Sequence, residues 1–191
     1  MEFTRTDIPD VVICKPKVFG DHRGYFTETF RKDFLDEFLG YEVNFCQDNE
    51  SRSSFGVLRG MHYQLPPFAQ SKLVRVLEGA VLDVAVDLRN GSPSFGKSVI
   101  VELNQQNKKQ LFVPRGFAHG FVVLSEKATF AYKCDNYYAP KYDRGLMFND
   151  PELQINWKLK ESDLILSEKD QNQPRFKDAV FFDFNKNLYQ L

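Results

Sequence analysis

The stretch that decides the fold class is L-V-R-V-L-E-G-A-V-L-D-V-A-V-D-L, residues 73–88. Residues 73–77 and 81–88 are rich in valine and leucine, which favour strands. In the second segment an aliphatic face alternates with a face that carries Asp83. Glu78–Gly79 is a candidate hairpin turn, because glycine tolerates the backbone angles of tight turns. This stretch therefore predicts two neighbouring β-strands.

Short segments of the same kind continue in both directions. They cover residues 11–13, 17–19, 25–30, 43–49, 98–103, 110–113, 121–124 and 129–135, with a further candidate at 155–157. Many short strands separated by regular turn signals are typical of an all-β sandwich or barrel. Residues 31–39 have the apolar spacing of a helix, and Gly40 stands where a C-terminal cap belongs. We therefore expect an all-β fold with a few short helices.

The chain length sets the domain organisation. A chain of 191 residues can form one domain with a sizeable core, so we expect a single domain over residues 1–191. After Pro151 the strand pattern weakens, and we treat the residues after about 171 as a C-terminal tail. For its last part, F-K-D-A-V-F-F-D-F-N-K-N-L-Y-Q-L (176–191), periodicity does not decide between helix and strand.

Composition argues against several classes of partner. The formal net charge is −1, which gives no electrostatic reason to bind nucleic acid or an anionic membrane. No apolar run is long enough to span a bilayer, and the N-terminus M-E-F-T-R-T-D-I-P has no hydrophobic signal region. Cys14, Cys46 and Cys134 are odd in number and far apart, so we interpret them as reduced thiols. We expect a cytoplasmic protein without a nucleic-acid or membrane partner.

Candidate chemistry gathers in G-V-L-R-G-M-H-Y-Q-L-P-P-F-A-Q-S-K, residues 56–72. Arg59 can bind a phosphate, His62 can move a proton near neutral pH, and Lys72 can stabilise an oxyanion. Arg59 and His62 are three residues apart, which places them on opposite faces of a regular strand. If both serve one site, the strand must bend or bulge between them, and Gly60 is the natural place. Taken alone, the stretch also fits a solvated strand end with a structural histidine.

Strand alternation singles out two more side chains. In residues 128–134, Tyr132 shares a face with Ala128, Phe130 and Cys134, so it is expected on the buried side. There its hydroxyl needs a hydrogen-bond partner or a task, and a core tyrosine with a satisfied hydroxyl is the simpler interpretation. Lys72 shares a face with two valines, and an inward lysine is costly unless it is paired or used.

Several longer motifs occur together along the chain. They are F-G-D-H-R-G-Y-F-T-E (19–28), Q-D-N (47–49), V-L-R-G-M-H-Y-Q (57–64), V-P-R-G-F-A-H-G-F (113–121) and A-Y-K-C-D-N-Y-Y-A-P (131–140). In this order and spacing the chain resembles the dTDP-4-dehydrorhamnose 3,5-epimerase family over roughly residues 11–170. Several long motifs together are far more specific than one short motif.

The resemblance implies a fold and a reaction. The fold is a metal-free cupin jelly roll, usually a dimer. The reaction inverts carbons 3 and 5 of dTDP-4-keto-6-deoxyglucose in dTDP-L-rhamnose biosynthesis, with no cofactor. By match to the family, His62 is the general base and Tyr132 the general acid. Asp170 orients His62, and Lys72 lies near the sugar ketone.

The resemblance also implies a set of substrate contacts. These are Arg23 and Arg59 on the diphosphate, Glu28, Gln47, Asp48 and Asn49 on the nucleotide, Tyr138 stacked on thymine, and His119, Asp143 and Lys169 elsewhere on the substrate. Asp143 stands where many members of the family have Glu.

The segment 25–30 suggests how a dimer would form. Phe26, Glu28 and Phe30 alternate onto one face, which is too apolar for solvent and carries a charge suited to a ligand. We expect this segment to complete the partner's site, with Phe26 as a further binding residue and Arg23 and Glu28 reaching across the interface.

Three alternatives stay open. A related cupin could epimerise one carbon only, or isomerise the ketone, with the same histidines. A metal cupin needs clustered histidine and carboxylate ligands, whereas this chain has only His22, His62 and His119 and no H-x-H motif. A sugar-binding β-sandwich without catalysis would explain the aromatic residues and arginines, but not a buried Tyr132 matched to a base.

Overall fold

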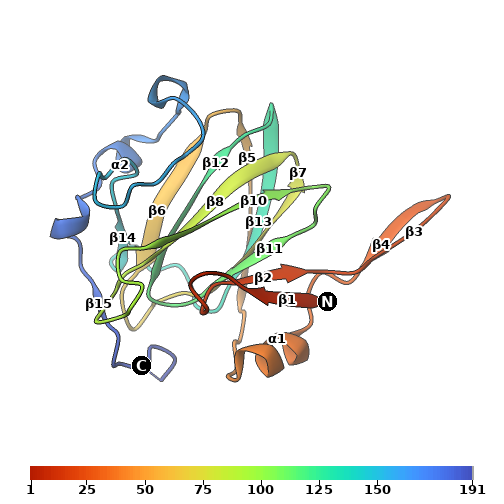
Figure 1. Cartoon of the computed structure of the whole chain (residues 1–191), viewed down its shortest axis with the longest axis horizontal. Helices are drawn as coiled ribbons and strands as arrows, with labels where there is room; N and C mark the ends of the chain where they lie inside the picture. Colours follow the sequence, from red (N-terminus) through yellow and green to blue (C-terminus); the bar gives the residue numbers. More distant parts are fainter. Residues whose placement is uncertain (191) are drawn as a thin grey trace.

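A computed structural model describes residues 1–190, which form two antiparallel β-sheets packed face to face (Figure 1). The larger sheet contains, in spatial order, β1 (Glu2–Arg5), β2 (Val12–Lys15), β11 (Gln110–Val113), β7 (Lys72–Glu78), β13 (Lys127–Cys134) and β5 (Gln47–Ser54). The smaller sheet contains β10 (Ser98–Asn104), β8 (Ala80–Asp87), β12 (Phe117–Val123), β6 (Leu58–Gln64) and β14 (Asp143–Gly145). The predicted all-β sandwich is confirmed. We call the two layers the six-stranded and the five-stranded sheet.

The hairpin predicted at Glu78–Gly79 is wrong. The strands on either side of it, β7 and β8, belong to different sheets. Gly79 has a φ of 80°, and its N–H donates to the side-chain carbonyl of Gln105 at 2.8 Å. The turn therefore carries the chain from one layer to the other. The chain crosses in the same way from β10 to β11 and from β12 to β13, which is the connectivity of a jelly roll.

The core lies in the space between the sheets and continues behind the five-stranded sheet. Val74 and Val76 of β7 and Phe130 of β13 meet Val81 and Phe121 from the opposite layer. The second face of β8 packs against the C-terminal part of the chain, so β8 is buried on both faces. This double burial explains its nearly continuous apolar sequence. Each fully buried Val, Leu or Phe contributes about 1.5–3 kcal/mol relative to an exposed one.

The predicted helix is confirmed within one residue as α1 (Lys32–Leu39). Gly40 adopts the left-handed conformation, with a φ of 82°, and its N–H donates to the carbonyl of Asp36. Leu35 is buried in a small apolar cluster that α1 forms beside the six-stranded sheet. The helix thus packs against the outer face of the six-stranded sheet, below β1 and β2 in Figure 1.

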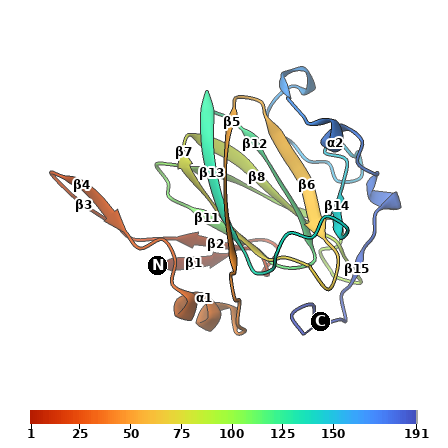
Figure 2. The same ribbon diagram turned by 180° about the vertical axis from the view of Figure 1, so that it is seen from behind.

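The N-terminal hairpin departs from the prediction. The strand expected over residues 25–30 is β4 (Gly24–Thr27), which pairs only with β3 (Val18–Asp21). This hairpin, which we call the arm (residues 18–27), projects from the sandwich in both views (Figures 1 and 2). Phe26 is 69% exposed. Glu28 follows the end of β4, so it does not share a strand face with Phe26 and Phe30 as predicted.

Two other strand predictions need correction. The strand expected at 43–49 begins at Gln47 as β5 and runs to Ser54, because the polar residues 50–54 pair with β13 at the edge of the sheet. No strand forms at 155–157 within the described residues. Trp157 instead packs into the core and donates its indole N–H to the carbonyl of Phe148 at 2.9 Å.

The C-terminal part crosses the outer face of the five-stranded sheet (Figure 1). It contains the 3₁₀ turns η1 (Glu161–Asp163) and η2 (Phe176–Asp178), the short helix α2 (Glu168–Gln171) and β15 (Phe182–Asp183), which pairs in parallel with β9 (Arg89–Asn90). Its last residue, Leu191, lies outside the described residues. No helix within residues 1–190 has the length and apolar character to cross a membrane.

Candidate active site

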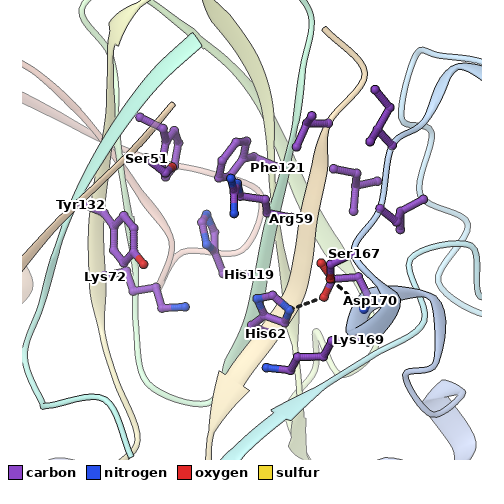
Figure 3. A pocket seen from close by; sticks show the side chains of 15 residues that line it. Ser51, Arg59, His62, Lys72, His119, Phe121, Tyr132, Ser167, Lys169 and Asp170 are labelled. Atoms are coloured by element: carbon purple, nitrogen blue, oxygen red, sulfur yellow. Dashed lines mark hydrogen bonds and ion pairs between the residues drawn. The ribbon is translucent and has the colours of Figure 1, made fainter. Parts of the chain in front are cut away.

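A cavity of about 490 Å³ opens between the two sheets (Figure 3). The six-stranded sheet contributes Lys72, Tyr132 and Phe130, and the five-stranded sheet contributes Arg59, His62, His119 and Phe121. Residues 165–167, 169 and 170 close it on one side. The cavity thus brings together, from both sheets, five of the side chains that the sequence singled out: Arg59, His62, Lys72, His119 and Tyr132.

Arg59 and His62 reach the same cavity because β6 is irregular between them. In the pairing of β6 with β12, His62 opposes His119 and Arg59 opposes Phe121, so three steps on β6 match two on β12. The extra residue is the predicted bulge, and it brings both side chains to one face. Gly60 has a φ of 141°, and a Cβ there would lie 2.5 Å from Cα of Gly120. Only glycine fits this backbone.

His62 is held by a carboxylate from another part of the chain. Its Nε2 lies 2.5 Å from Oδ1 of Asp170, and its other ring nitrogen faces the cavity (Figure 3). Asp170 is buried in α2, where its N–H donates to the side chain of Ser167, the N-terminal cap. Burial alone would raise the pKa of Asp170, but the hydrogen bond and the charge of His62 outweigh it and lower the pKa. The ionised carboxylate therefore accepts the proton on Nε2 and leaves the cavity-facing nitrogen free to act as a base.

Lys72 and Tyr132 lie side by side on the opposite sheet. They project from β7 and β13, where Tyr132 pairs with Val74 and Cys134 pairs with Lys72. Their polar ends point into the cavity toward the histidines (Figure 3). Burial lowers the pKa of Lys72 and raises that of Tyr132. The tyrosine hydroxyl therefore stays protonated and can donate, while the lysine places a positive charge in a water-poor site.

A second histidine–aspartate pair joins His119, which lines the cavity, to Asp83 in the core behind it. Nε2 of His119 is 2.9 and 3.0 Å from the two carboxylate oxygens of Asp83, which is fully buried. The ring of Phe130 stacks on that of His119, with centroids 6.2 Å apart. Sequence reasoning did not include Asp83 in the site. The sequence does carry a signal for it, because Asp83 is the one charged residue in the otherwise apolar run 80–86 of β8.

A second cavity of about 330 Å³ adjoins the first and shares His62, Lys72, Tyr132 and Lys169 with it. Its further lining includes residues of three strands and of the loop that follows β13: Gln47, Asn49, Gln64, Tyr138 and Asp143. Asp143 accepts hydrogen bonds from the hydroxyl of Tyr138 at 3.2 Å and from the ammonium of Lys169. Asp143 thus ties Tyr138 to Lys169 at the edge of the cleft.

Four predicted site residues do not reach this cleft within their own chain. Arg23 pairs with Asp21 on the arm, and Phe26 lies beside it. Glu28 lies near Arg31 at the base of the arm. Asp48 points to the opposite side of β5 from Gln47 and Asn49, where it binds the ammonium of Lys133 at 2.9 Å.

The cleft also includes residues that sequence reasoning did not single out, among them Ser51, Phe121, Phe130 and Ser167. The motif V-P-R-G-F-A-H-G-F contains Phe121, but nothing in the sequence separated it from other core phenylalanines. As for metals, the described part of the chain holds no group of three or more His, Cys, Asp or Glu side chains placed to bind an ion.

Comparison with known proteins identifies the family. The family model described as dTDP-4-dehydrorhamnose 3,5-epimerase matches residues 5–178. The chain belongs to this epimerase family. A member of the family from Shigella flexneri is 51% identical over 182 residues, which cover 95% of this chain and 99% of the relative.

Solved structures of the epimerase family match the whole fold. The crystal structure of the epimerase from Elizabethkingia anophelis NUHP1 superposes with a TM-score of 0.90 at 54% identity, covering 93% of this chain and 97% of that one. The dTDP-6-deoxy-D-glucose-3,5-epimerase of Legionella pneumophila Philadelphia 1, solved in complex with dTDP-4-keto-L-rhamnose, gives a TM-score of 0.93 at 45% identity and covers 97% and 99%. The epimerase resemblance and the cupin fold inferred from the motifs are thereby confirmed.

Proposed function

We propose that this chain inverts carbons 3 and 5 of dTDP-4-keto-6-deoxyglucose and so forms dTDP-4-keto-L-rhamnose. One observation carries the proposal. His62, held by Asp170, faces Tyr132 and Lys72 across a single cavity, and the two groups stand on opposite sheets. Inversion at a carbon needs a base on one side of the sugar and a proton donor on the other, and this arrangement supplies both.

The chemistry follows from the ketone at carbon 4. Protons on carbons 3 and 5 are both α to it, so each can leave to form an enolate. The free nitrogen of His62 takes the proton, and Asp170 stabilises the resulting imidazolium. The charge of Lys72 lowers the energy of the enolate oxygen, an effect worth about 3 kcal/mol for one preorganised group. Tyr132 then returns a proton from the opposite face.

The two adjoining cavities suggest how the substrate lies. The reacting sugar would sit where they meet, beside the shared residues His62, Lys72 and Tyr132. Arg59 offers a planar fork to the diphosphate. The ring of Tyr138, which is exposed at the outer cavity, would stack on thymine. Asp143 would act on the substrate through Lys169 and Tyr138, which it already binds.

Incubation with dTDP-4-keto-6-deoxyglucose in deuterium oxide, followed by NMR, tests this function. We expect deuterium at carbons 3 and 5 together with inversion at both. Label and inversion at one carbon only would instead support a single-carbon epimerase. A sugar-binding sandwich would bind the nucleotide sugar and exchange neither proton.

The arm extends the proposal to a homodimer. It exposes large apolar side chains, and its Arg23 and Phe26 do not reach the cleft of their own chain. We propose that the arm of a second copy brings Arg23, Phe26 and Glu28 to the cleft. The three free cysteines fit a reducing compartment, so the proposed location is the cytoplasm.

Mixing two inactive variants tests the exchange of arms. Arg23→Ala damages only the arm, and His62→Gln damages only the cleft. If arms serve the partner, a heterodimer has one intact site, and an equimolar mixture regains about one quarter of wild-type activity. No recovery after verified subunit exchange would show that the arm serves its own chain.

A further inference from the structure

The C-terminal segment (residues 184–190) returns to the body of the protein and docks there. Leu188 is buried in the core cluster behind the five-stranded sheet, and a Cβ added at Gly116 would lie 3.1 Å from its Cδ1. The guanidinium of Arg115 donates to the carbonyl of Leu188 at 2.8 Å and lies 5.0 Å from the ring centre of Tyr189. None of the motifs that identify the family includes this segment.

Tyr189 connects this segment to the residue before Lys72. Its hydroxyl lies 2.7 Å from the hydroxyl of Ser71, which is fully buried. The N–H of Ser71 donates to Oδ1 of Asp135 at 2.5 Å, and the carbonyl of Ser71 accepts from the N–H of Asp135 at 3.2 Å. Asp135 in turn binds Nε of Arg115 at 3.0 Å. Ser71 is therefore held through its side chain and both of its backbone groups.

This network lies at the end of the pairing between β7 and its neighbours. Lys72 is the first residue of β7 and makes its terminal pairs, with Val113 on one side and Cys134 on the other. Beyond it the ladder ends, and strand ends fray unless other contacts fix them. A lysine ammonium sits on a flexible four-carbon stem, so its place in the cavity depends on a fixed Cα. An error of about 1 Å in such a group can lower a rate by as much as 10²-fold.

We propose that Tyr189 is a positioning residue, which fixes Lys72 in the cavity through its hydrogen bond to Ser71. The C-terminal segment then belongs to the machinery of the reaction although it touches no substrate. This inference rests on the role of Lys72 in the proposed function. It predicts that the hydroxyl of Tyr189 matters for turnover and not for nucleotide binding.

The test is a double-mutant cycle between Tyr189→Phe and Lys72→Met, with epimerisation followed by NMR. Tyr189→Phe keeps the ring over Arg115 and deletes only the hydroxyl. We expect kcat to fall about 5- to 10-fold while KM stays within about twofold, because the nucleotide contacts are untouched. Lys72→Met alone should lower kcat by about 10²-fold. Adding Tyr189→Phe to Lys72→Met should lower kcat no further.

Two more variants control for general damage. Ser71→Ala removes the other end of the same hydrogen bond and should give the same loss as Tyr189→Phe, without adding to it. Tyr41→Phe removes only the longer of the two hydrogen bonds between Tyr189 and other hydroxyls, at 3.4 Å, and leaves the bond to Ser71 in place, so it should leave kcat unchanged. Thermal unfolding of each variant shows that the fold is intact at the assay temperature.

The outcomes separate this inference from the proposed function. The positioning role of Tyr189 would be overturned by either of two results: wild-type kcat in Tyr189→Phe, or a decrease in kcat by the same factor in the wild-type and the Lys72→Met backgrounds. Both results would leave the lysine in the mechanism. Full activity of Lys72→Met would remove the lysine from the mechanism, and the positioning role with it.

Discussion

Two histidine–aspartate pairs have their histidines on the neighbouring strands β6 and β12 and differ in their surroundings. His62 and His119 oppose each other in the pairing of β6 with β12. The side chain of His62 is 31% exposed and shares one nitrogen with Asp170, whereas that of His119 is 8% exposed and faces both oxygens of Asp83. The same two residue types thus form an accessible pair at the mouth of the cavity and an enclosed pair at its base.

This difference in exposure indicates which histidine can act as the general base. A general base needs a free nitrogen within reach of the substrate and a partner that stabilises its charged form. In both pairs the aspartate contacts only Nε2 of the histidine, so accessibility separates them. His62 meets both needs, because its second nitrogen faces the cavity and its side chain is the more exposed of the two. Asp83 is fully buried, so we expect the His119 pair to shape and stabilise the site and to contribute a substrate contact.

The largest expected effect separates the two histidines directly. Glutamine can donate a hydrogen bond to either aspartate but cannot act as a base, so it is the matched substitution. We expect His62→Gln to lower kcat by about 10²- to 10⁴-fold and His119→Gln to lower kcat/KM by about 10-fold, mainly through KM. Steady-state kinetics on both variants measures the contrast. Equal losses in kcat would mean that both pairs take part in proton transfer.

Substitution of the two aspartates should affect different properties, kcat for Asp170 and the free energy of unfolding for Asp83. Asp170→Asn can present an N–H to Nε2 of His62 and so favour the wrong tautomer, and we expect about a 10²-fold loss in kcat with little loss of stability. Asp83→Asn leaves a fully buried hydrogen-bonded group imperfectly paired, and we expect the free energy of unfolding to fall by about 1–3 kcal/mol. Denaturant unfolding and kinetics on both variants separate the effects. A large loss of stability in Asp170→Asn alone would reverse the assignment.

Lys72 faces both pairs, and its proposed role predicts a pH dependence of turnover. On this proposal the lysine must be charged to stabilise the enolate, and burial lowers its pKa below the ordinary value of 10.5. Activity should therefore fall as pH rises through this lowered pKa. The pKa of Tyr132 is raised, so the tyrosine loses its proton at higher pH. In Lys72→Arg, which stays charged, the alkaline fall in kcat should move upward by about one pH unit or more. If kcat in Lys72→Arg depends on pH as in the wild type, the alkaline decrease in kcat belongs to another group.

The smallest expected effect is that of a chelator. His62 and His119 oppose each other across two strands, and each has a carboxylate neighbour, so a shared metal ion would make both histidines ligands and erase the contrast between them. We expect exhaustive chelation to change kcat by less than about twofold. Loss of turnover with chelator, restored by a divalent metal, would contradict the proton-transfer mechanism.

Sequence reasoning predicted the parts of the site that depend on local rules. Strand alternation placed Tyr132 on an inward face, and the spacing of Arg59 and His62 required the irregularity found at Gly60. For Lys72 alternation was only suggestive, because the opposite face of its strand is apolar too. The partnership of His62 with Asp170 spans 108 positions and depends on how the C-terminal part folds back, so only the family resemblance pointed to it.

Long-range packing explains the predictions that failed. Glu78–Gly79 has the residues of a hairpin turn, but the choice between returning within a sheet and crossing to the other layer depends on distant contacts such as Gln105. The docking of Tyr189 against Ser71 joins positions 118 residues apart, and no periodicity in the tail indicates it.

The measurement that tests the central claim most directly is deuterium incorporation by two variants, His62→Gln and Tyr132→Phe. Both are incubated with dTDP-4-keto-6-deoxyglucose in deuterium oxide, and carbons 3 and 5 are followed by NMR. If His62 removes the proton and Tyr132 returns one from the opposite face, His62→Gln shows neither exchange nor inversion. Tyr132→Phe still forms the enolate, which the protonated histidine can quench on the original face, so deuterium enters with configuration retained. Exchange in His62→Gln together with none in Tyr132→Phe would contradict the account.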